Sequence, residues 1–304
     1  MKLDPAVLEL LKLNAQKTTV SSGAGGGCSS ASSSTIRTQL DDGTYRRFFM
    51  KTARGDAGRV MVEGEHTSLT AIHTIVPTLC PQPHGWGTFN TSPSTHFLVV
   101  DYLDTSTPSP QTTTPHKRQP QSLASKLATL HTTPAPTPPN HPGPVFGFPV
   151  PTCCGDTPQE NTYKQSWADF YATNRLGFIL RRAEESNGID TELRTLVERT
   201  ISLVVPRLLD DGHLNNGRGV MPVVVHGDLW AGNVGRGRLG LDKGEVEEEV
   251  IFDPSASYAH SEFELGIMRM FGGFGRGFWE EYHALCPRGE PVGEFEDRVG
   301  VYEL

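Results

Sequence analysis

The sequence is poor in the features that mark specialised classes of protein. Its cysteines are few, odd in number and without any CxxC spacing; they are Cys28, Cys80, Cys153, Cys154 and Cys286. Such a set argues against a zinc module or a disulfide framework and favours a reducing compartment. Long apolar runs are also missing, and none approaches the roughly 18 residues that a membrane-spanning helix requires.

The N-terminus lacks the pattern of a signal peptide, because its leucines are interrupted by Asp4, Glu9 and Lys12. Basic residues are in the minority: 27 Lys and Arg against 35 Asp and Glu give a net charge of −8. An acidic chain is a poor binder of nucleic acid, which requires clustered positive charge. We therefore expect a soluble cytoplasmic protein with neither a nucleic-acid nor a membrane partner.

What is present suffices for a folded core. Hydrophobic residues make up 36% of the 304 residues, although 32 Gly and 23 Pro lower that share. At roughly 100–200 residues per domain, the length predicts one large domain or two modest ones. The composition is that of a globular enzyme or binding protein.

The first third of the chain has the pattern of a β-rich region. The predicted elements, in order, are a helix over 4–14, strands over 18–20, 35–40 and 46–51, a helix over 60–76 and a strand over 97–100. A Gly/Ser-rich stretch at 21–30 separates the first two strands, and no regular helix or strand centre tolerates so many glycines.

The remainder is predicted to be mainly helical. Two Pro/Thr-rich stretches, at 104–120 and 132–144, are typical of surface loops. The other predicted elements are helices over 123–131, 167–187, 190–208 and from 261 onward, and strands over 223–225 and 250–253. Ser261 and Glu264 fit a capping box at the start of the last helix.

The strongest chemical signal is the segment HGDLWAGN at 226–233, with Asp253 at the end of a later strand. In phosphoryl transfer, an Asp accepts the proton of the attacking hydroxyl, while an Asn and a second Asp hold Mg²⁺ against the phosphates. Asp228 is therefore the candidate base, and Asn233 and Asp253 are the candidate metal ligands. The alternative is that these residues form ordinary turns, but all of them follow apolar strands.

Lys51 ends a hydrophobic strand, where an unpaired charge is costly. Glu65, on the following helix, is its predicted partner. Glu63 is the competing candidate. However, Glu65 has Leu69 at i+4 and Ile72 at i+7, which places it on the inward-facing side of the helix.

The Gly/Ser-rich stretch precedes that lysine. The backbone N–H groups of Gly25, Gly26 and Gly27 can approach the phosphates of a nucleotide. A flexible linker is the alternative explanation for this stretch.

In chain order, a Gly-rich loop, a strand lysine, a helix glutamate, the HGD segment and a final aspartate form the set of a protein-kinase-like fold. We therefore predict an α+β, two-lobed structure, with a β-rich N-lobe at 1–103 and a mainly helical C-lobe at 104–304. The connection between the lobes carries Asp101, Tyr102 and Leu103, which would meet the adenine of the nucleotide.

The motifs resemble those of a known family. HGDLWAGN is similar to the catalytic segment of the aminoglycoside and choline kinases, where protein kinases have HRDLKxxN. The segments VHGDLWAGNV, IFDPSASYAHSEFELGIMRMFGGF, FGFPVPTCCGDTPQ and EGE-x₃-L together resemble the fructosamine-3-kinase (ketosamine-3-kinase) family. The likeness extends from the Gly-rich stretch to the last residues, outside the Pro/Thr-rich stretches.

This resemblance implies an ATP- and Mg²⁺-dependent kinase acting on the 3-hydroxyl of ketosamines, the ribulosamines and fructosamines that glycation forms on protein lysines. Phosphate is a better leaving group than hydroxide. The 3-phosphate would therefore leave by β-elimination, and hydrolysis of the Schiff base would free the lysine. The expected partners are glycated proteins, and the expected outcome is repair by deglycation.

The resemblance also implies roles for individual residues. Lys51 with Glu65 would orient the phosphates, and Trp230, His260 and Glu262 would contribute to the sugar pocket. For Glu262 the alternative is a helix-start residue that interacts with the helix dipole.

Cys28 lies within the Gly-rich stretch, where members of the resembled family often carry a cysteine that links two chains by a disulfide and lowers activity. A thiol near loop N–H groups and the cationic Lys51 is expected to have a lowered pKa. The resemblance thus implies a redox-dependent homodimer, with an inert loop residue as the alternative. The pair Cys153 and Cys154 is predicted to serve packing alone.

Two features depart from the resembled family. Its members usually continue past the position of Leu304 into closing helices, so we expect Phe278, Trp279 and Tyr282 to be exposed in a truncated C-lobe. The stretch 235–249 also lengthens the gap between the two catalytic aspartates. Two alternative functions therefore stay open: a kinase for free aminoglycosides or choline, and a catalytically weak nucleotide-binding pseudokinase.

Overall fold

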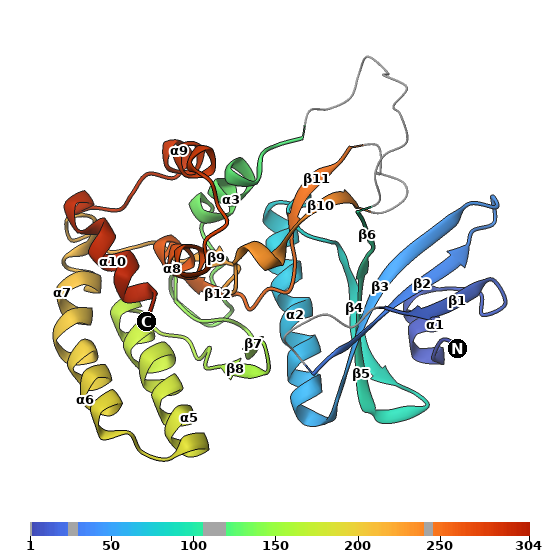
Figure 1. Ribbon diagram of the computed structural model, residues 1–304, viewed down its shortest axis with the longest axis horizontal. Coiled ribbons are helices and arrows are strands. Elements are labelled where there is room, and N and C mark those ends of the chain that lie inside the picture. Colours follow the sequence, from blue (N-terminus) through green and yellow to red (C-terminus); the bar gives the residue numbers. More distant parts are fainter. Residues whose placement is uncertain (1, 24–29, 106–119, 240–245) are drawn as a thin grey trace.

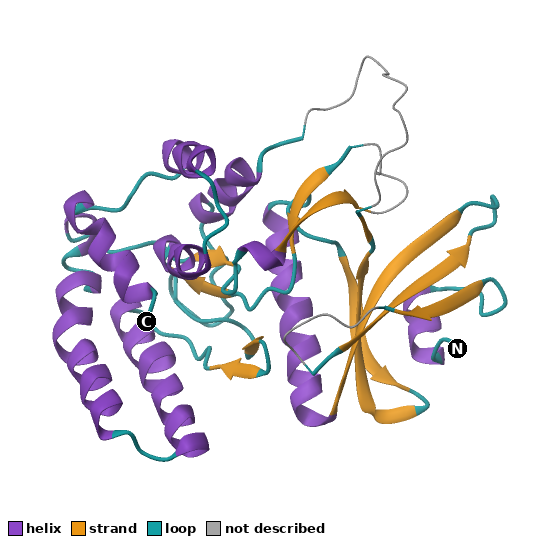
Figure 2. Cartoon of the chain, viewed as in Figure 1, coloured by secondary structure: helices purple, strands orange, loops and turns teal. Residues whose placement is uncertain are grey.

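Residues 2–23, 30–105, 120–239 and 246–304 are described in the computed structural model. Figure 1 shows one lobe built around a sheet and a second, larger lobe, with helix α2 on the side of the sheet that faces the second lobe. Strands dominate the first lobe and helices the second (Figure 2). This arrangement confirms the predicted α+β, two-lobed fold class.

The first lobe consists of a short helix, an antiparallel sheet and one long helix. Its elements are α1 (Pro5–Leu11), β1 (Thr18–Ser22), β2 (Ser32–Gln39), β3 (Tyr45–Arg54), α2 (Gly55–Ile75), β4 (Pro83–Phe89) and β5 (Ser92–Asp101). The strands pair in the order β1-β2-β3-β5-β4. Strand β4 was not predicted, because Pro83, Gly85 and Gly87 weaken its strand pattern, as is common in edge strands.

Strand β3 has one face toward α1 and one toward α2. Phe48 and Met50 are buried in a cluster that includes Val7 of α1. Because successive side chains of a strand point to opposite faces, Lys51 points toward α2. The alternation of β3 thus delivers a single ammonium group to the side of the sheet that faces the second lobe.

The second lobe contains the remaining elements. They are β6 (Leu103–Asp104), α3 (Leu123–Thr132), β7 (Thr152–Cys154), β8 (Thr157–Gln159), α4 (Trp167–Phe170), α5 (Gly177–Asn187), α6 (Thr191–Arg199), α7 (Val205–Leu209), β9 (Val223–Val225), β10 (Val234–Leu239), β11 (Glu248–Ile251), β12 (Ser257–Ala259), α8 (Ser261–Phe271), α9 (Arg276–Leu285) and α10 (Phe295–Tyr302). Strands β10 and β12 were not predicted. Strand β10 carries Gly235 and Gly237, and β12 is a short strand that pairs with β9.

The predicted capping box at α8 is wrong. Ser261 is the first residue of the helix, and its N-cap, His260, makes no side-chain capping bond. Instead, the carboxylate of Glu264 accepts hydrogen bonds from the backbone N–H groups of His226 and Gly227. The acidic side chain that the sequence pattern assigned to a helix end therefore supports the HGD segment.

The C-terminal helices cover the aromatic residues that we expected to be exposed. Tyr282 is only 1% exposed, and Phe278 and Trp279 are half-buried against the main core. Helix α10 packs on α8, and Trp167 Nε1 donates a hydrogen bond to Tyr302 Oη at 2.7 Å. The predicted exposure of these rings is therefore wrong for Tyr282, because the described part of the lobe already closes over it.

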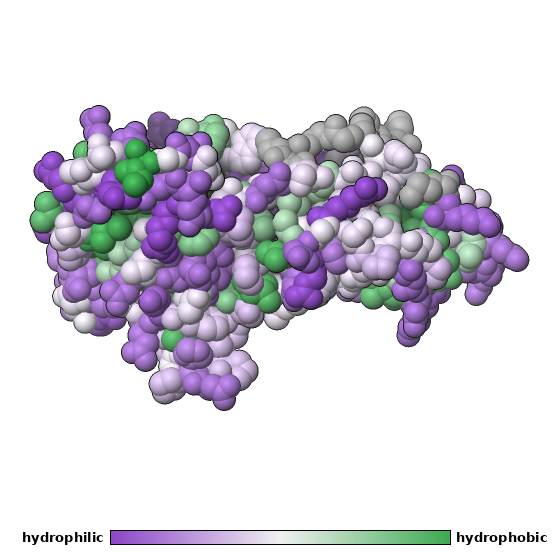
Figure 3. Space-filling model, turned by 90° about the horizontal axis from the view of Figure 1, so that it is seen from below, coloured by the Kyte–Doolittle hydropathy of each residue, from purple (hydrophilic) through white to green (hydrophobic). Residues whose placement is uncertain are grey.

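The molecular surface is largely hydrophilic on the face seen from below, with scattered apolar patches (Figure 3). Exposed apolar side chains on the α5–α6 pair and its connection include Ile179, Ile189, Leu193 and Leu196. Among the described helices, none is both long enough and apolar enough to cross a bilayer.

Gly64 of α2 is predicted to be essential for the fit of this helix against the second lobe. A Cβ at this position would lie 2.7 Å from Pro151 O. We expect Gly64→Ala to lower the free energy of unfolding by about 1–3 kcal/mol, because backbone must move to admit the methyl group.

Gly300→Ala is the matched control, since it lies in helix α10 with no atom near the added Cβ. It should stabilise the protein by about 0.5–1 kcal/mol, the usual gain of alanine over glycine in a helix. Urea unfolding of both variants measures the difference. Equal effects of the two substitutions would contradict the predicted tight contact at Gly64.

Candidate active site

The two lobes meet at Lys51. Its Nζ donates hydrogen bonds to both carboxylate oxygens of Glu65 on α2, each at 2.8 Å, and to Asp253 Oδ1 at 2.7 Å. Burial acts to lower the pKa of Lys51, but the two carboxylates outweigh it and hold the pKa above its ordinary value. The ammonium group is therefore charged, and the predicted Lys51–Glu65 pair is present.

The HGD segment leaves the buried strand β9 through a turn that only glycine fits. Gly227 has φ +81°, and a Cβ there would lie 2.1 Å from Ser255 O. His226 Nε2 donates a hydrogen bond to Phe252 O at 2.9 Å, which ties this turn to the strand end that bears Asp253. Together with the hydrogen bonds to Glu264, these contacts fix the backbone of the HGD turn and of the strand end that carries Asp253.

Asp228 and Asn233 face each other across the short helical turn 231–233. Asn233 Nδ2 donates to Asp228 O at 2.8 Å and to Asp228 Oδ2 at 3.2 Å. Burial raises the pKa of Asp228, and the neighbouring His226 and the hydrogen bond from Asn233 offset part of this rise. A carboxylate whose pKa is raised in this way is a stronger proton acceptor than an exposed aspartate.

Asn233 and Asp253 offer the oxygen ligands that Mg²⁺ prefers, with water and phosphate oxygens completing its shell. The Asp253 side chain is 48% exposed, so its carboxylate opens toward solvent and can receive a cation. Asp253 has φ +58°, a conformation that is strained for a residue with a side chain. The described residues hold no cluster of three or more His, Cys, Asp or Glu with metal-ligand geometry.

The interlobe connection lies beside this cluster, but its residues have other partners. The Asp101 N–H donates to Gln82 O at 2.9 Å, and Asp101 Oδ1 hydrogen-bonds to His84 Nε2 at 2.7 Å. Tyr102 stacks under the Arg47 guanidinium, 4.3 Å from the ring centroid. The backbone N–H of Asp101 is therefore already used within the sheet, and the adenine contact predicted for this segment remains a prediction.

Leu103 pairs with Leu239 in the short β6–β10 ladder. A Cβ at Gly235 would lie 2.9 Å from the Phe252 ring and 3.1 Å from Leu103 Cδ2. Apolar side chains thus join the interlobe connection to the strand end that precedes Asp253.

Trp230 packs against residues of the second lobe, and its predicted contact with the sugar stays a prediction. Its ring lies over Gly232, where a Cβ would come within 2.1 Å of it, and its centroid is 5.7 Å from that of Phe271. Gly25, Gly26, Gly27 and Cys28 lie outside the described residues. Their predicted roles in phosphate binding and redox control therefore stay predictions.

In the structure, His260 and Glu262, which are predicted to contribute to the sugar pocket, have partners within the protein. His260 is 5% exposed, and its Nδ1 and Tyr302 Oη are joined by a hydrogen bond of 2.9 Å. Glu262 binds the fully buried Arg298 through Nε at 2.7 Å and Nη2 at 3.0 Å. Both side chains hold α8 against α10, and their role in the sugar pocket stays a prediction.

Two side chains that sequence reasoning did not select do reach the site. Glu264 supports the HGD turn. The sequence could have indicated this role, because Glu264 is a charged residue on the side of the helix that also carries the buried Leu265 and Met268. Burial and the charge of the Asp228 carboxylate raise the pKa of the Cys154 thiol to about 12, and no sequence pattern indicated this neighbour. Cys153 packs against the main core, so the packing role predicted for the cysteine pair is confirmed for this residue only.

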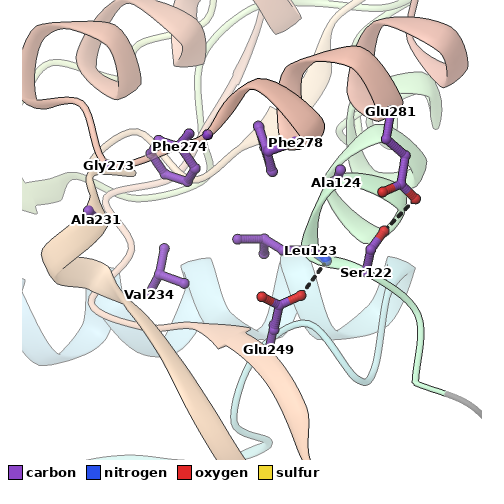
Figure 4. Close-up of a pocket in the computed structure, with 11 residues that line it drawn as sticks. Ser122, Leu123, Ala124, Ala231, Val234, Glu249, Gly273, Phe274, Phe278 and Glu281 are labelled. Carbon is purple, nitrogen blue, oxygen red and sulfur yellow. Dashed lines mark hydrogen bonds between the residues drawn. The ribbon is translucent and has the colours of Figure 1, made fainter.

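A pocket of about 400 Å³ lies next to the catalytic segment, lined by Ala231 together with Phe274 and Phe278 (Figure 4). Its carboxylates come from Glu249 and Glu281. Glu249 accepts a hydrogen bond from Leu123 N at 3.1 Å, and Glu281 accepts one from Ser122 Oγ at 2.5 Å. Both carboxylates thus accept hydrogen bonds from the first residues of helix α3, so they have a structural role at this helix end.

The buried position of His260 predicts how the stability of the fold depends on pH. Burial lowers the pKa of His260 to about 4, whereas an exposed histidine has a pKa of about 6.5. As pH falls from about 6.5 to about 4, the unfolded chain gains a proton that the folded chain does not, so stability is lost in this window.

Replacement of His260 by Gln removes this titration. We expect the melting temperature of the His260→Gln variant to fall less steeply than that of the wild type between these two pH values. Thermal unfolding at a series of pH values measures both slopes. Parallel slopes would show that His260 takes up its proton equally in both states.

Comparison with known proteins identifies relatives of this chain. A family model described as fructosamine kinase matches residues 6–304. Ketosamine-3-kinase of Mus musculus is 32% identical over 297 residues, which cover 92% of this chain and 85% of the mouse protein. The chloroplastic protein-ribulosamine 3-kinase of Arabidopsis thaliana is 30% identical, over 92% of this chain and 73% of its own.

Solved structures of similar fold come from two bacteria. A candidate fructosamine-3-kinase of Haemophilus somnus has a TM-score of 0.71 at 19% identity, covering 99% of this chain and 86% of its own. A counterpart from Thermobifida fusca has a TM-score of 0.67 at 23% identity, covering 99% and 90%. These two structures support the kinase-like fold. Because the fructosamine kinase model matches residues 6–304, the chain belongs to the fructosamine kinase family.

Proposed function

We propose that this protein transfers the γ-phosphoryl group of ATP to the 3-hydroxyl of ketosamines on protein lysines. The observation that carries the proposal is the contact of Lys51 with Glu65 and Asp253, at 2.8 Å and 2.7 Å, beside the hydrogen-bonded pair Asp228 and Asn233. The acceptor class follows from the family and from the relatives named ketosamine and ribulosamine kinases.

Lys51 and the two candidate ligands would bind the phosphates. In this role Lys51 keeps Glu65 as its partner, and the N–H group that binds Asp253 in this structure would turn toward the phosphate oxygens. Asn233 and Asp253 would hold Mg²⁺, which neutralises the charge that develops on the transferred group. Residues 101–103, with Leu103 next to Phe252, would take the adenine end of ATP.

Asp228 would act as the general base. Its carboxylate accepts the proton of the sugar 3-hydroxyl while the hydroxyl oxygen bonds to the γ-phosphorus and the bond to the ADP oxygen breaks. The raised pKa of Asp228 suits this role, because it increases the affinity of the carboxylate for the transferred proton. Asn233 keeps the carboxylate in place through its side-chain amide.

The phosphorylated ketosamine would decompose spontaneously and release the lysine. The 3-phosphate leaves by β-elimination, and hydrolysis of the resulting Schiff base frees the lysine. The protein would therefore need to supply only the phosphorylation step for deglycation to follow. Its partners would be glycated proteins. The cytoplasmic location stays a prediction, and relatives from Arabidopsis and rice are named chloroplastic.

The test is ATP consumption with ribulosyl-lysine and fructosyl-lysine as acceptors, for the wild type and Asp228→Asn. We expect turnover by the wild type and a loss of roughly 10²–10⁴-fold in kcat for the variant, because the base is removed. Choline and aminoglycosides serve as competing acceptors in the same assay.

Phosphorylation of choline or aminoglycosides alone would overturn the proposed acceptor. Nucleotide binding without turnover on any acceptor would identify a pseudokinase. Equal rates for the wild type and Asp228→Asn would contradict the assigned base.

A further inference from the structure

A cavity of about 720 Å³ lies in the first lobe, a size within the roughly 300–1,000 Å³ typical of small-molecule pockets. Met50 and Thr52, the two neighbours of Lys51 in β3, line it. Because successive side chains of a strand point to opposite faces, the cavity lies on the reverse side of the sheet from the Lys51 cluster. This is the side on which α1 packs, opposite α2 (Figure 1).

The inner part of the cavity is apolar. Met50 is only 3% exposed, and Val20 of β1 and Phe89 of β4 pack against the same cluster and also line the cavity. Hydroxyl groups accompany them, and those of Ser92 and Thr95 share a hydrogen bond of 2.8 Å. An occupant would therefore bury an apolar body against the reverse face of the sheet.

Three residues of the lining are ionisable, namely Lys2, Asp4 and Arg54. The Asp4 carboxylate is already engaged. It is part of a residue that is 7% exposed, and it accepts hydrogen bonds from the backbone N–H groups of Ala6 at 2.9 Å and of Thr91 at 3.0 Å. Asp4 therefore has little negative charge left to offer to a ligand.

The two cations of the lining are in a different position. In the part of the chain that the structure describes, neither Lys2 nor Arg54 forms an ion pair. Both are exposed, so their charges lie at the solvent end of the cavity, whereas the apolar side chains lie deeper. The chain as a whole carries a net charge of −8, and this opening is a place where positive charge is in excess.

We propose that this cavity is a binding site for a small amphipathic anion. The apolar body of the ligand would pack on Val20, Met50 and Phe89, and its carboxylate or phosphate group would pair with Arg54 and Lys2. A guanidinium group suits this task, because its N–H groups match both kinds of anion in pairs. The site is distinct from the candidate active site, so its test does not depend on kinase activity.

The first experiment measures binding of the fluorescent dye anilinonaphthalene sulfonate, which joins an apolar body to one anionic group. Its neutral counterpart, phenylnaphthylamine, lacks the sulfonate. We expect saturable binding of the anionic dye, and an affinity about fivefold or more lower for the neutral compound, because hydrogen bonds to a charged group are lost. Inorganic sulfate, which has the charge without the apolar body, should not displace the dye.

The second experiment removes the two positive charges. Arg54→Gln should weaken binding of the anionic dye about fivefold or more, and the double variant Lys2→Gln/Arg54→Gln should weaken it further. Arg59→Gln and Lys12→Gln are the matched controls, since they make the same changes in the same lobe outside the cavity lining. Both controls should bind the dye as the wild type does.

The third experiment locates the dye through the methyl resonances of methionine. Met50 lines the cavity, whereas Met221 and Met270 are 53% and 51% exposed elsewhere on the surface. We expect the dye to shift the Met50 resonance and to leave those of Met221 and Met270 in place. Octanoate or octyl phosphate should displace the dye, and the stronger of the two identifies the preferred anionic group.

Three results would overturn the inference. The first is the absence of saturable binding to the wild type. The second is an equal affinity of the dye for the wild type and for the double variant Lys2→Gln/Arg54→Gln. The third is a dye that leaves the Met50 resonance unchanged or that neither octanoate nor octyl phosphate displaces.

Discussion

The contact on which the rest of the structure depends is that of Lys51 with one carboxylate from each lobe. Strand β3 supplies the ammonium group, α2 supplies Glu65, and the strand end after β11 supplies Asp253. An ammonium group that is only 12% exposed would be costly without these partners. Because the partners come from different lobes, this single charge ties the sheet to the helical lobe.

Around this contact the helical lobe uses buried polar groups to hold the catalytic backbone. Glu264 is fully buried and accepts hydrogen bonds from two successive N–H groups of the HGD turn. His226 links this turn to Phe252, one residue before Asp253. A buried acceptor of this kind allows backbone N–H groups to remain in the core without water. The backbone that carries Asp228 and Asp253 is therefore held by contacts within the protein.

Much of this site could be predicted from the sequence, and the failures have physical reasons. Helical periodicity correctly favoured Glu65 over Glu63 as the partner of Lys51, because inward-facing positions repeat along a helix. Helical periodicity does not indicate which distant residue will pair with an inward-facing side chain. The buried Arg298 lies 36 positions from Glu262 in the chain and takes its carboxylate, and Cys154 becomes a neighbour of Asp228 only after folding. Strands β4 and β10 escaped prediction because their glycines and Pro83 weaken the strand pattern.

Two neighbouring glutamates of helix α2 allow a direct test of whether Glu65 supports ATP turnover by holding Lys51 in place. Among the described residues, the Glu63 carboxylate forms an ion pair with Arg59, one helical turn earlier, at 3.7 Å. The measurement is kcat/KM for ATP in Glu65→Gln and Glu63→Gln, two variants that make the same chemical change. We expect kcat/KM for ATP to fall about tenfold or more in Glu65→Gln, because this variant leaves Lys51 with one carboxylate fewer. We expect near wild-type kcat/KM in Glu63→Gln. Equal values for the two variants would contradict it.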